Sequence, residues 1–317
     1  MPCFDFFWKS SLWRKIRVKA PFSLLGKVYW RFDSQLKTSS NRRKCADLNK
    51  KIYSLSCKSS PYDFGEIYVS LTTYPARIES AYYAICSILD QSVRPNKILL
   101  TLIKNEFPHG LSSLSPNIRS LEEKGLEIIW EEDNLRPHNK YFYSMQKYPG
   151  ALIVTIDDDI LYPNDTIEKL INSYKKFPQS ISAFHTDKFS FRNNQLDDYS
   201  KAIIGYNQEI LTPKLDLLAE GFAGVLYPPS LLPQEAFCKE MIQKCSPLND
   251  DIWLKCIELK NNIPVVCAAK KHNIQVLTTV QNTALFIQNR QKNYNDEQLK
   301  RTQTILGINV SLHDKYN

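Results

Sequence analysis

Short apolar runs alternate with amphipathic segments from residue 66 onward, and the two patterns predict different elements. Runs rich in β-branched residues predict buried strands, whereas apolar residues spaced three and four apart predict one face of a helix. The predicted strands are Ile67–Leu71, Lys97–Leu102, Leu126–Trp130, Ala151–Ile156 and Ile263–Ala268. The predicted helices are Ile78–Leu89, Ile118–Lys124, Asn139–Lys147, a segment starting near Asp165 and a short helix near Asp296–Ile305.

Strands and helices that alternate in this way form β-α-β units. The pattern therefore predicts an α/β fold with a mostly parallel central sheet and helices on both faces. The chain has 317 residues, 43% of them hydrophobic, and is long enough to bury a substantial core. Because ligands bind at the carboxyl ends of strands in such sheets, residues that follow predicted strands are the candidates for chemistry.

Charge is unevenly distributed along the chain. Residues 1–58 carry 14 Lys or Arg and only 3 Asp, whereas the whole chain has a formal net charge of +8. The cations are interleaved with bulky apolar residues, among them Phe4, Phe6, Phe7, Trp8, Trp13, Phe22 and Trp30. A helix with aromatic residues on one face and cations on the other can lie on an anionic membrane surface. The alternative is a helix packed on the body with its charges in water. No nucleic-acid partner is expected, because no nucleic-acid-binding module is recognisable.

Three segments are expected from these patterns. Residues 1–60 form a basic aromatic leader and a linker, the linker being the Ser-, Lys- and Asn-rich residues 34–60. Residues 61–275 form the main α/β domain, and residues 276–317 form a C-terminal tail with a short helix.

The expected location is cytoplasmic, peripherally on the inner face of the cell membrane. No run approaches the roughly 18 apolar residues that predict a spanning helix, and the first residues lack the basic-then-apolar order of a signal peptide. The eight cysteines form no Cys-x-x-Cys pair, which indicates reduced thiols.

Three consecutive carboxylates, Asp157, Asp158 and Asp159, follow the strongest predicted strand. Adjacent anions repel each other, and burial raises their pKa values unless a cation neutralises them. Mg²⁺ or Mn²⁺ suits this need, because such an ion takes one or two protein carboxylates together with phosphate oxygens. The alternative is an Asx turn that caps the helix starting near Asp165, but the strand context favours a metal site.

The segment Val154–Pro163 resembles the Asp-x-Asp segment of GT-A glycosyltransferases. The layout around it is similar to bacterial family-2-like members that build surface polysaccharides. The further segments that carry the resemblance are Val69–Arg77, Glu132–Lys140, Glu220–Pro229 and Pro247–Leu254. The resemblance implies that residues 61–275 are a GT-A catalytic domain that uses a nucleotide-sugar donor and Mn²⁺ or Mg²⁺.

For the donor, the resemblance implies a set of residues that contact the base, the ribose or the diphosphate. These are Thr72, Tyr74, Pro75, Arg77, Asp133, Lys140, Asp157 and Asp158. The implied metal ligands are Asp159 and Asp157, with His272 as a further candidate. Alternatives remain open: Arg77 pairs with Glu79 on a surface helix, the loop before Lys140 is solvated and capped by Asn139, and His272 is structural.

For the acceptor, the resemblance implies Gly221, Gly224 and Trp253 as neighbours of the bound saccharide. Asp251 matches the family's catalytic base, and Asp250 stands where the family has a glutamate. A carboxylate there takes the proton of the acceptor hydroxyl in inverting transfer. The alternatives are a tight turn at the two glycines and helix capping by Asn249 or Asp250.

The resemblance thus implies a metal-dependent, inverting glycosyltransferase. It would move a sugar from a nucleoside-diphosphate sugar to a saccharide or lipid-linked saccharide in surface polysaccharide biosynthesis. A haloacid-dehalogenase-type phosphotransferase is an alternative, because an apolar strand followed by Asp-x-Asp is also its nucleophile motif, although on its first strand. A non-catalytic carbohydrate-binding protein at the membrane is another. Loss of the triplet or of Asp251 would favour that interpretation, and neither is lost.

Overall fold

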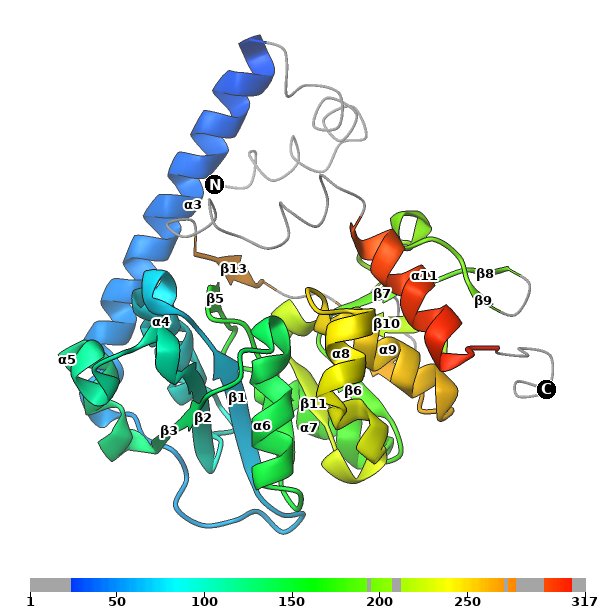
Figure 1. The fold of residues 1–317 in the computed structure, drawn as a ribbon. Coiled ribbons are helices and arrows are strands. Elements are labelled where there is room, and N and C mark those ends of the chain that lie inside the picture. Colours follow the sequence, from blue (N-terminus) through cyan, green and yellow to red (C-terminus); the bar gives the residue numbers. More distant parts are fainter. Residues whose placement is uncertain (1–23, 193–194, 207–211, 271–272, 278–293, 310–317) are drawn as a thin grey trace.

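The computed structural model describes residues 24–192, 195–206, 212–270, 273–277 and 294–309. A seven-stranded sheet forms its centre (Figure 1). In spatial order the strands are β12 (Val265–Cys267), β6 (Ile181–Ala183), β11 (Val225–Tyr227), β4 (Leu152–Thr155), β1 (Ile67–Thr72), β2 (Lys97–Ile103) and β3 (Leu126–Glu131). β11 runs antiparallel to both of its neighbours, and the other adjacent pairs are parallel. The predicted α/β class with a mostly parallel sheet is confirmed.

Alternate side chains of the strands build one hydrophobic core on each face of the sheet. Tyr68 faces one core, and its neighbours Ile67 and Val69 face the other. The helices of the first core are α6 (Asn139–Lys147), α8 (Lys239–Cys245), α9 (Asp250–Lys260) and α11 (Tyr294–Leu306). Those of the second core are α3 (Leu24–Lys51), α4 (Ile78–Leu89), α5 (Pro116–Ser120) and α7 (Thr166–Lys176).

Three short antiparallel pairs lie outside the main sheet. They are β5 (Ile160–Leu161) with β13 (Gln275–Val276), β7 (Thr186–Lys188) with β10 (Leu217–Ala219), and β8 (Phe191–Arg192) with β9 (Gln195–Leu196). The first pair matters for the site, because β5 begins directly after the acidic triplet.

The prediction of a linker over residues 34–60 is wrong for its first part, because residues 34–51 continue α3. This stretch contains no glycine or proline to end the helix. Leu48 is buried in the second core and Asn41 hydrogen-bonds to the Val276 carbonyl, so tertiary contacts outweigh the weak helix propensity of Ser and Asn. Figure 1 shows the N-terminal half of α3 projecting beyond the body.

Residues 1–23 of the aromatic and basic leader lie outside the described residues, and the rest of the leader, residues 24–33, forms the start of α3. Among the helices that the structure describes, none has the length and apolar character needed to cross a bilayer.

Candidate active site

The acidic triplet lies at the carboxyl end of β4, in the middle of the sheet. β1 runs parallel to β4, so the ends of both strands reach the same edge. Asp158 and Asp159 are buried, whereas the side chain of Asp157 is 34% exposed. Asp157 is therefore the most accessible carboxylate of the three.

Asp158 is held by two groups from the segment after β1. The hydroxyl of Thr73 donates to its Oδ2 atom at 2.5 Å, and Nη1 of Arg77 lies 3.0 Å from its Oδ1 atom. Arg77 also lies 3.3 Å from Oδ2 of Asp159. Burial raises the pKa of Asp158 to about 7, although Arg77 lowers it. Arg77 thus pairs with the triplet and not with Glu79, which was the alternative.

Thr73 was missed by the sequence analysis, which selected its neighbour Thr72. The hydroxyl of Thr72 donates to the carbonyl of Thr101 on β2. Successive side chains of an extended segment point in opposite directions, so only one of the two can face the triplet. The sequence shows two consecutive threonines at the end of a predicted strand. It does not show which of the two hydroxyls points toward the triplet.

Lys140 joins the triplet to a second pair of carboxylates. It lies in the first turn of α6 and is only 5% exposed. Its Nζ atom is 2.9 Å from Oδ1 of Asp157 and 3.0 Å from Oδ2 of Asp250. Burial lowers the pKa of Lys140, but Asp157, Asp250 and Asp251 together raise it well above its ordinary value. The ammonium group is therefore charged and shared between two parts of the chain.

The second pair of carboxylates begins α9. Asn249 caps this helix, because its side chain accepts a hydrogen bond from the Ile252 amide at 2.9 Å. Asp250 and Asp251 are therefore not needed as caps. Burial, and then the neighbouring Asp250, raise the pKa of Asp251 well above its usual range, although Lys140 opposes this.

Gly221 lets the backbone approach these charges closely. Its amide donates to Oδ1 of Asp251 at 3.1 Å. A Cβ atom at this position would lie 2.6 Å from that oxygen and 2.8 Å from Nζ of Lys140, closer than real Cβ atoms come. These contacts are with the protein's own side chains, so the predicted role of Gly221 beside a bound saccharide stays a prediction. Gly224 has φ +102°, a conformation that suits the turn into β11.

Tyr162 connects the triplet to the Gly221 segment and was also missed. Its hydroxyl accepts a hydrogen bond from the Asp157 amide at 2.9 Å and donates to the Phe222 carbonyl at 2.8 Å. The only signal for Tyr162 in the sequence is its position five residues after Asp157.

Further carboxyl groups lie next to Asp251. Glu220 hydrogen-bonds to Asp187, and burial followed by Asp251 and Asp187 raises the pKa of Glu220 well above its usual range. The hydroxyl of Tyr199 lies 3.3 Å from Oε1 of Glu220. Asp187 lies in the middle of β7 and carried no sequence signal, because no motif surrounds it.

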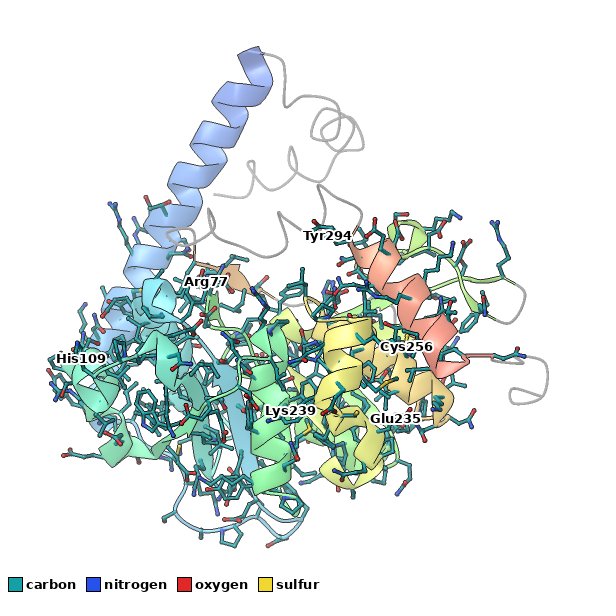
Figure 2. All side chains as sticks on the ribbon, in the orientation of Figure 1. Arg77, His109, Glu235, Lys239, Cys256 and Tyr294 are labelled. Carbon is teal, nitrogen blue, oxygen red and sulfur yellow. The ribbon has the colours of Figure 1, made fainter. Side chains whose placement is uncertain are left out.

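Two predicted residues are not brought to this site. Trp253 is fully buried and its indole N–H donates to the Ala236 carbonyl, so the prediction that it faces an acceptor is wrong. Asp133 is exposed and pairs with Lys239 at 2.5 Å. Figure 2 shows Lys239 well apart from Arg77.

Of the remaining predicted residues, Tyr74 and Pro75 lie in the segment next to Arg77, and His272 is not described. Pro75 is exposed and opens the turn Pro75–Arg77, and the ring of Tyr74 lies 5.7 Å from the Arg77 guanidinium carbon. His272 lies outside the described residues.

The donor set fits a divalent cation that is bound together with a phosphate. Five carboxyl groups, Asp157 to Asp159 together with Asp250 and Asp251, lie near the cations Arg77 and Lys140. Within the described ranges, no three Asp, Glu, His or Cys side chains are arranged to hold a metal by themselves. An ion with one or two protein carboxylates and several phosphate or water oxygens agrees with both observations.

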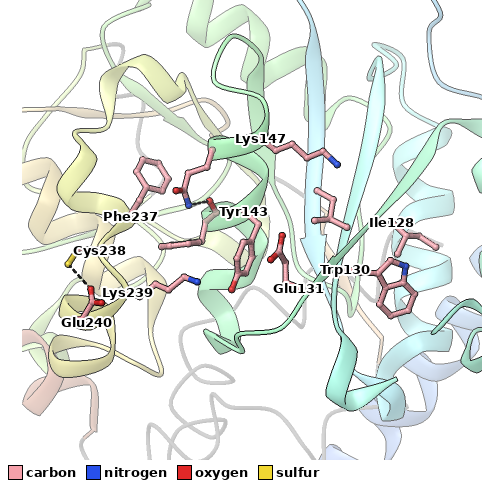
Figure 3. Close-up of a pocket in the computed structure, with 12 residues that line it drawn as sticks. Ile128, Trp130, Glu131, Tyr143, Lys147, Phe237, Cys238, Lys239 and Glu240 are labelled. Carbon is pink, nitrogen blue, oxygen red and sulfur yellow. Dashed lines mark hydrogen bonds between the residues drawn. The ribbon is translucent and has the colours of Figure 1, made fainter. Parts of the chain in front are cut away.

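A large cavity lies elsewhere on the protein. Its volume is 710 Å³, and β3, α6 and the start of α8 line it with residues that include Glu131, Tyr143 and Lys239 (Figure 3). None of the triplet, Lys140 or Asp251 is part of its wall.

No family model matches the chain, and no curated protein matches it in sequence. Among solved structures, S. aureus TarS is 13% identical, with a TM-score of 0.45 over 66% of this chain and 59% of that chain. The mannosyltransferase PcManGT from Pyrobaculum calidifontis, in complex with GDP-Man and Mn²⁺, is 11% identical, with a TM-score of 0.42 over 76% and 64%. UTP-bound UGPase from Acinetobacter baumannii is 9% identical, with a TM-score of 0.41 over 76% and 98%. This chain thus spans about three-fifths of the TarS 1–349 chain and 37% of the longer TarS chain. At these identities and TM-scores the similarities do not assign an activity to the protein.

Proposed function

We propose that this protein is a glycosyltransferase that takes a sugar from a nucleoside-diphosphate sugar. The observation that carries the proposal is the position of Lys140, which lies within 3.0 Å of both Asp157 and Asp250. The buried ammonium group of Lys140 therefore joins two sets of carboxylates. One set, at the end of β4, suits a metal ion, and the other is the pair at the start of α9. That arrangement suits a reaction in which a charged leaving group and a reacting hydroxyl meet.

On the donor side, Asp157 and Asp159 would hold Mn²⁺ or Mg²⁺, which supplies positive charge that offsets the departing diphosphate. Lys140 keeps its charge at every physiological pH, because the carboxylates around it raise its pKa. Arg77 and Thr73 fix Asp158, and through the chain they fix its two neighbours.

On the acceptor side, Asp251 is the proposed general base. Its carboxylate takes the proton of the acceptor hydroxyl while that oxygen bonds to the anomeric carbon and the bond to the diphosphate breaks. The raised pKa of Asp251 makes it a stronger base than an exposed aspartate. Direct attack of this kind inverts the anomeric centre.

The acceptor class is a saccharide or a lipid-linked saccharide of surface polysaccharide biosynthesis. Membrane attachment by the leader is part of this proposal and is supported by the 14 cations and interleaved aromatic residues of residues 1–58. Deletion of residues 1–33 should abolish binding to anionic liposomes. Unchanged binding after that deletion would remove the membrane from the proposal.

The test of the proposal is thermal stabilisation by UDP, GDP and CMP, each with Mn²⁺ and with a chelator. A ligand that binds only the native state raises the melting temperature. We expect a shift with one nucleotide that needs the metal, is lost in Asp159→Asn and is retained in the surface control Asp198→Asn. Absence of a shift with every nucleotide, in folded protein, would contradict the proposal and favour a phosphotransferase or a binding protein.

A further inference from the structure

Two hydrogen bonds connect α3 to the short strand β13. The side-chain amide of Asn41 donates to the carbonyl of Val276 at 2.8 Å, and the amide of Gln275 donates to the hydroxyl of Ser40 at the same distance. Asn41 is buried although it is polar. More than 230 residues separate the partners in the sequence, so the contact joins two distant parts of the chain.

β13 in turn holds the backbone of the acidic triplet. Gln275 pairs with Leu161 and Val276 pairs with Ile160 in the antiparallel pair β13–β5. The next residue, Leu277, donates its amide to the carbonyl of Asp159 at 2.7 Å and is itself buried. Figure 1 shows β13 lying between α3 and β5.

A pair of two-residue strands has too few hydrogen bonds to be stable alone. β13 and β5 therefore depend on what packs against them. The side chains of Ser40 and Asn41 on α3 both bond to β13.

We propose that Asn41, assisted by Ser40, is a positioning residue for Asp159. Its amide holds β13 against β5, so the Leu277 amide keeps the Asp159 carbonyl, and with it the carboxylate, in place. The effect on ligand binding rests on the function proposed above, whereas the effect on β13 does not. α3 is thereby part of the site, although it lies outside the main α/β domain that the sequence predicts.

The first test is hydrogen exchange of the protein without ligand. Asn41→Ala should speed exchange of the Leu277 amide roughly tenfold, the size expected for one lost hydrogen bond. The matched control is Asn49→Ala, because Asn49 lies on the same helix and bonds to Tyr83 of α4 instead of β13. Ser40→Ala is the milder variant if Asn41→Ala does not fold. Unchanged exchange at Leu277 in the folded variants would overturn the proposal.

The second test is the affinity for the nucleotide that stabilises the wild-type protein. With Mn²⁺, Asn41→Ala should raise the Kd for this nucleotide roughly tenfold, because the displaced Asp159 binds less well the metal that nucleotide binding requires. Asn49→Ala should match the wild type under the same conditions. If the wild type binds no nucleotide, the proposed function fails while the exchange result stands. If the wild type binds and Asn41→Ala binds equally well with metal, the positioning role fails.

Discussion

At the residue scale, the site depends on how closely Lys140, Gly221 and Asp251 approach one another. A buried ammonium is stable only when carboxylates surround it, and Lys140 has Asp157 and Asp250 at about the same distance. The amide of Gly221 donates to Asp251 at a place where a side chain would not fit.

Gly221→Ala should therefore damage activity more than stability. The added methyl group displaces either Asp251 or Lys140, and a displacement of about 1 Å costs roughly 100-fold in rate. Gly150→Ala is the control, because a Cβ atom at Gly150 meets nothing within 4 Å. Comparable turnover of the two variants, measured as release of nucleoside diphosphate, would contradict this picture.

The sequence located several site residues but not their orientation. The strand before Asp157–Asp159 predicted where the triplet lies, and Lys140 and Asp251 followed from the resemblance of their segments. Thr73, which hydrogen-bonds to Asp158, was missed, and Trp253 was chosen although its position on α9 buries it. A motif gives spacing along the chain, and the direction of each side chain depends on strand and helix geometry.

At the scale of elements, α9 contains a buried ion pair away from the site. Lys255 and Glu258 are both almost fully buried, with Nζ 3.3 Å from Oε2. Burial raises the pKa of Glu258 to about 7, although Lys255 lowers it.

Removal of one partner should destabilise the protein strongly. Glu258→Gln leaves the Lys255 charge buried without a counter-ion and should cost about 3–5 kcal/mol at pH 8. The double variant Lys255→Met with Glu258→Leu should recover most of that loss. Denaturant unfolding measures both, and a single variant as stable as the wild type would show that the pair is not a buried ion pair in solution.

The turn before α6 contains a histidine that makes stability depend on pH. Burial lowers the pKa of His138 to about 4, although Asp250 raises it. The unfolded chain takes up this proton near pH 6.5 and the folded protein does so only near pH 4. The contribution of neutral His138 to the free energy of unfolding is therefore complete above pH 6.5 and falls as the pH drops toward 4.

Between pH 6.5 and pH 4 the free energy of unfolding should fall by about 3 kcal/mol because of His138, since its pKa differs by two to three units between the folded and unfolded states. His138→Gln should remove that part of the pH dependence. Urea unfolding at pH 7 and pH 4.5 checks it, and equal pH dependence in the variant and the wild type would rule out His138 as the cause.

Helices and strands with strong periodicity were predictable from the sequence, and those held by tertiary contacts were not. α4, α6 and β1 match the predicted segments closely. α3 was taken for a linker because Ser and Asn disfavour helices locally, whereas its stability comes from contacts such as Leu48 in the second core. β6 and β11 are only three residues long, too short to stand out as periodic segments.

At the scale of the whole molecule, the site is assembled from segments that are far apart in the chain. Five separate segments of the chain contribute to it, with the residues Arg77, Lys140, Asp157, Gly221 and Asp251. The alternation of strands and helices predicted the carboxyl ends of the strands as the place for ligands. Distances such as 3.0 Å between Lys140 and Asp250 follow from packing and are not readable from sequence spacing.

Asp251 is proposed to act as a base at a site that binds a nucleotide-sugar. The most direct measurement is release of nucleoside diphosphate from the donor sugar by the wild type and by Asp251→Asn, with nucleotide affinity measured on the same preparations. We expect Asp251→Asn to bind the nucleotide within about twofold of the wild type and to turn over about 100- to 10,000-fold more slowly. Turnover of Asp251→Asn at the wild-type rate, or a wild type that binds the donor and never releases the diphosphate, would contradict the proposal.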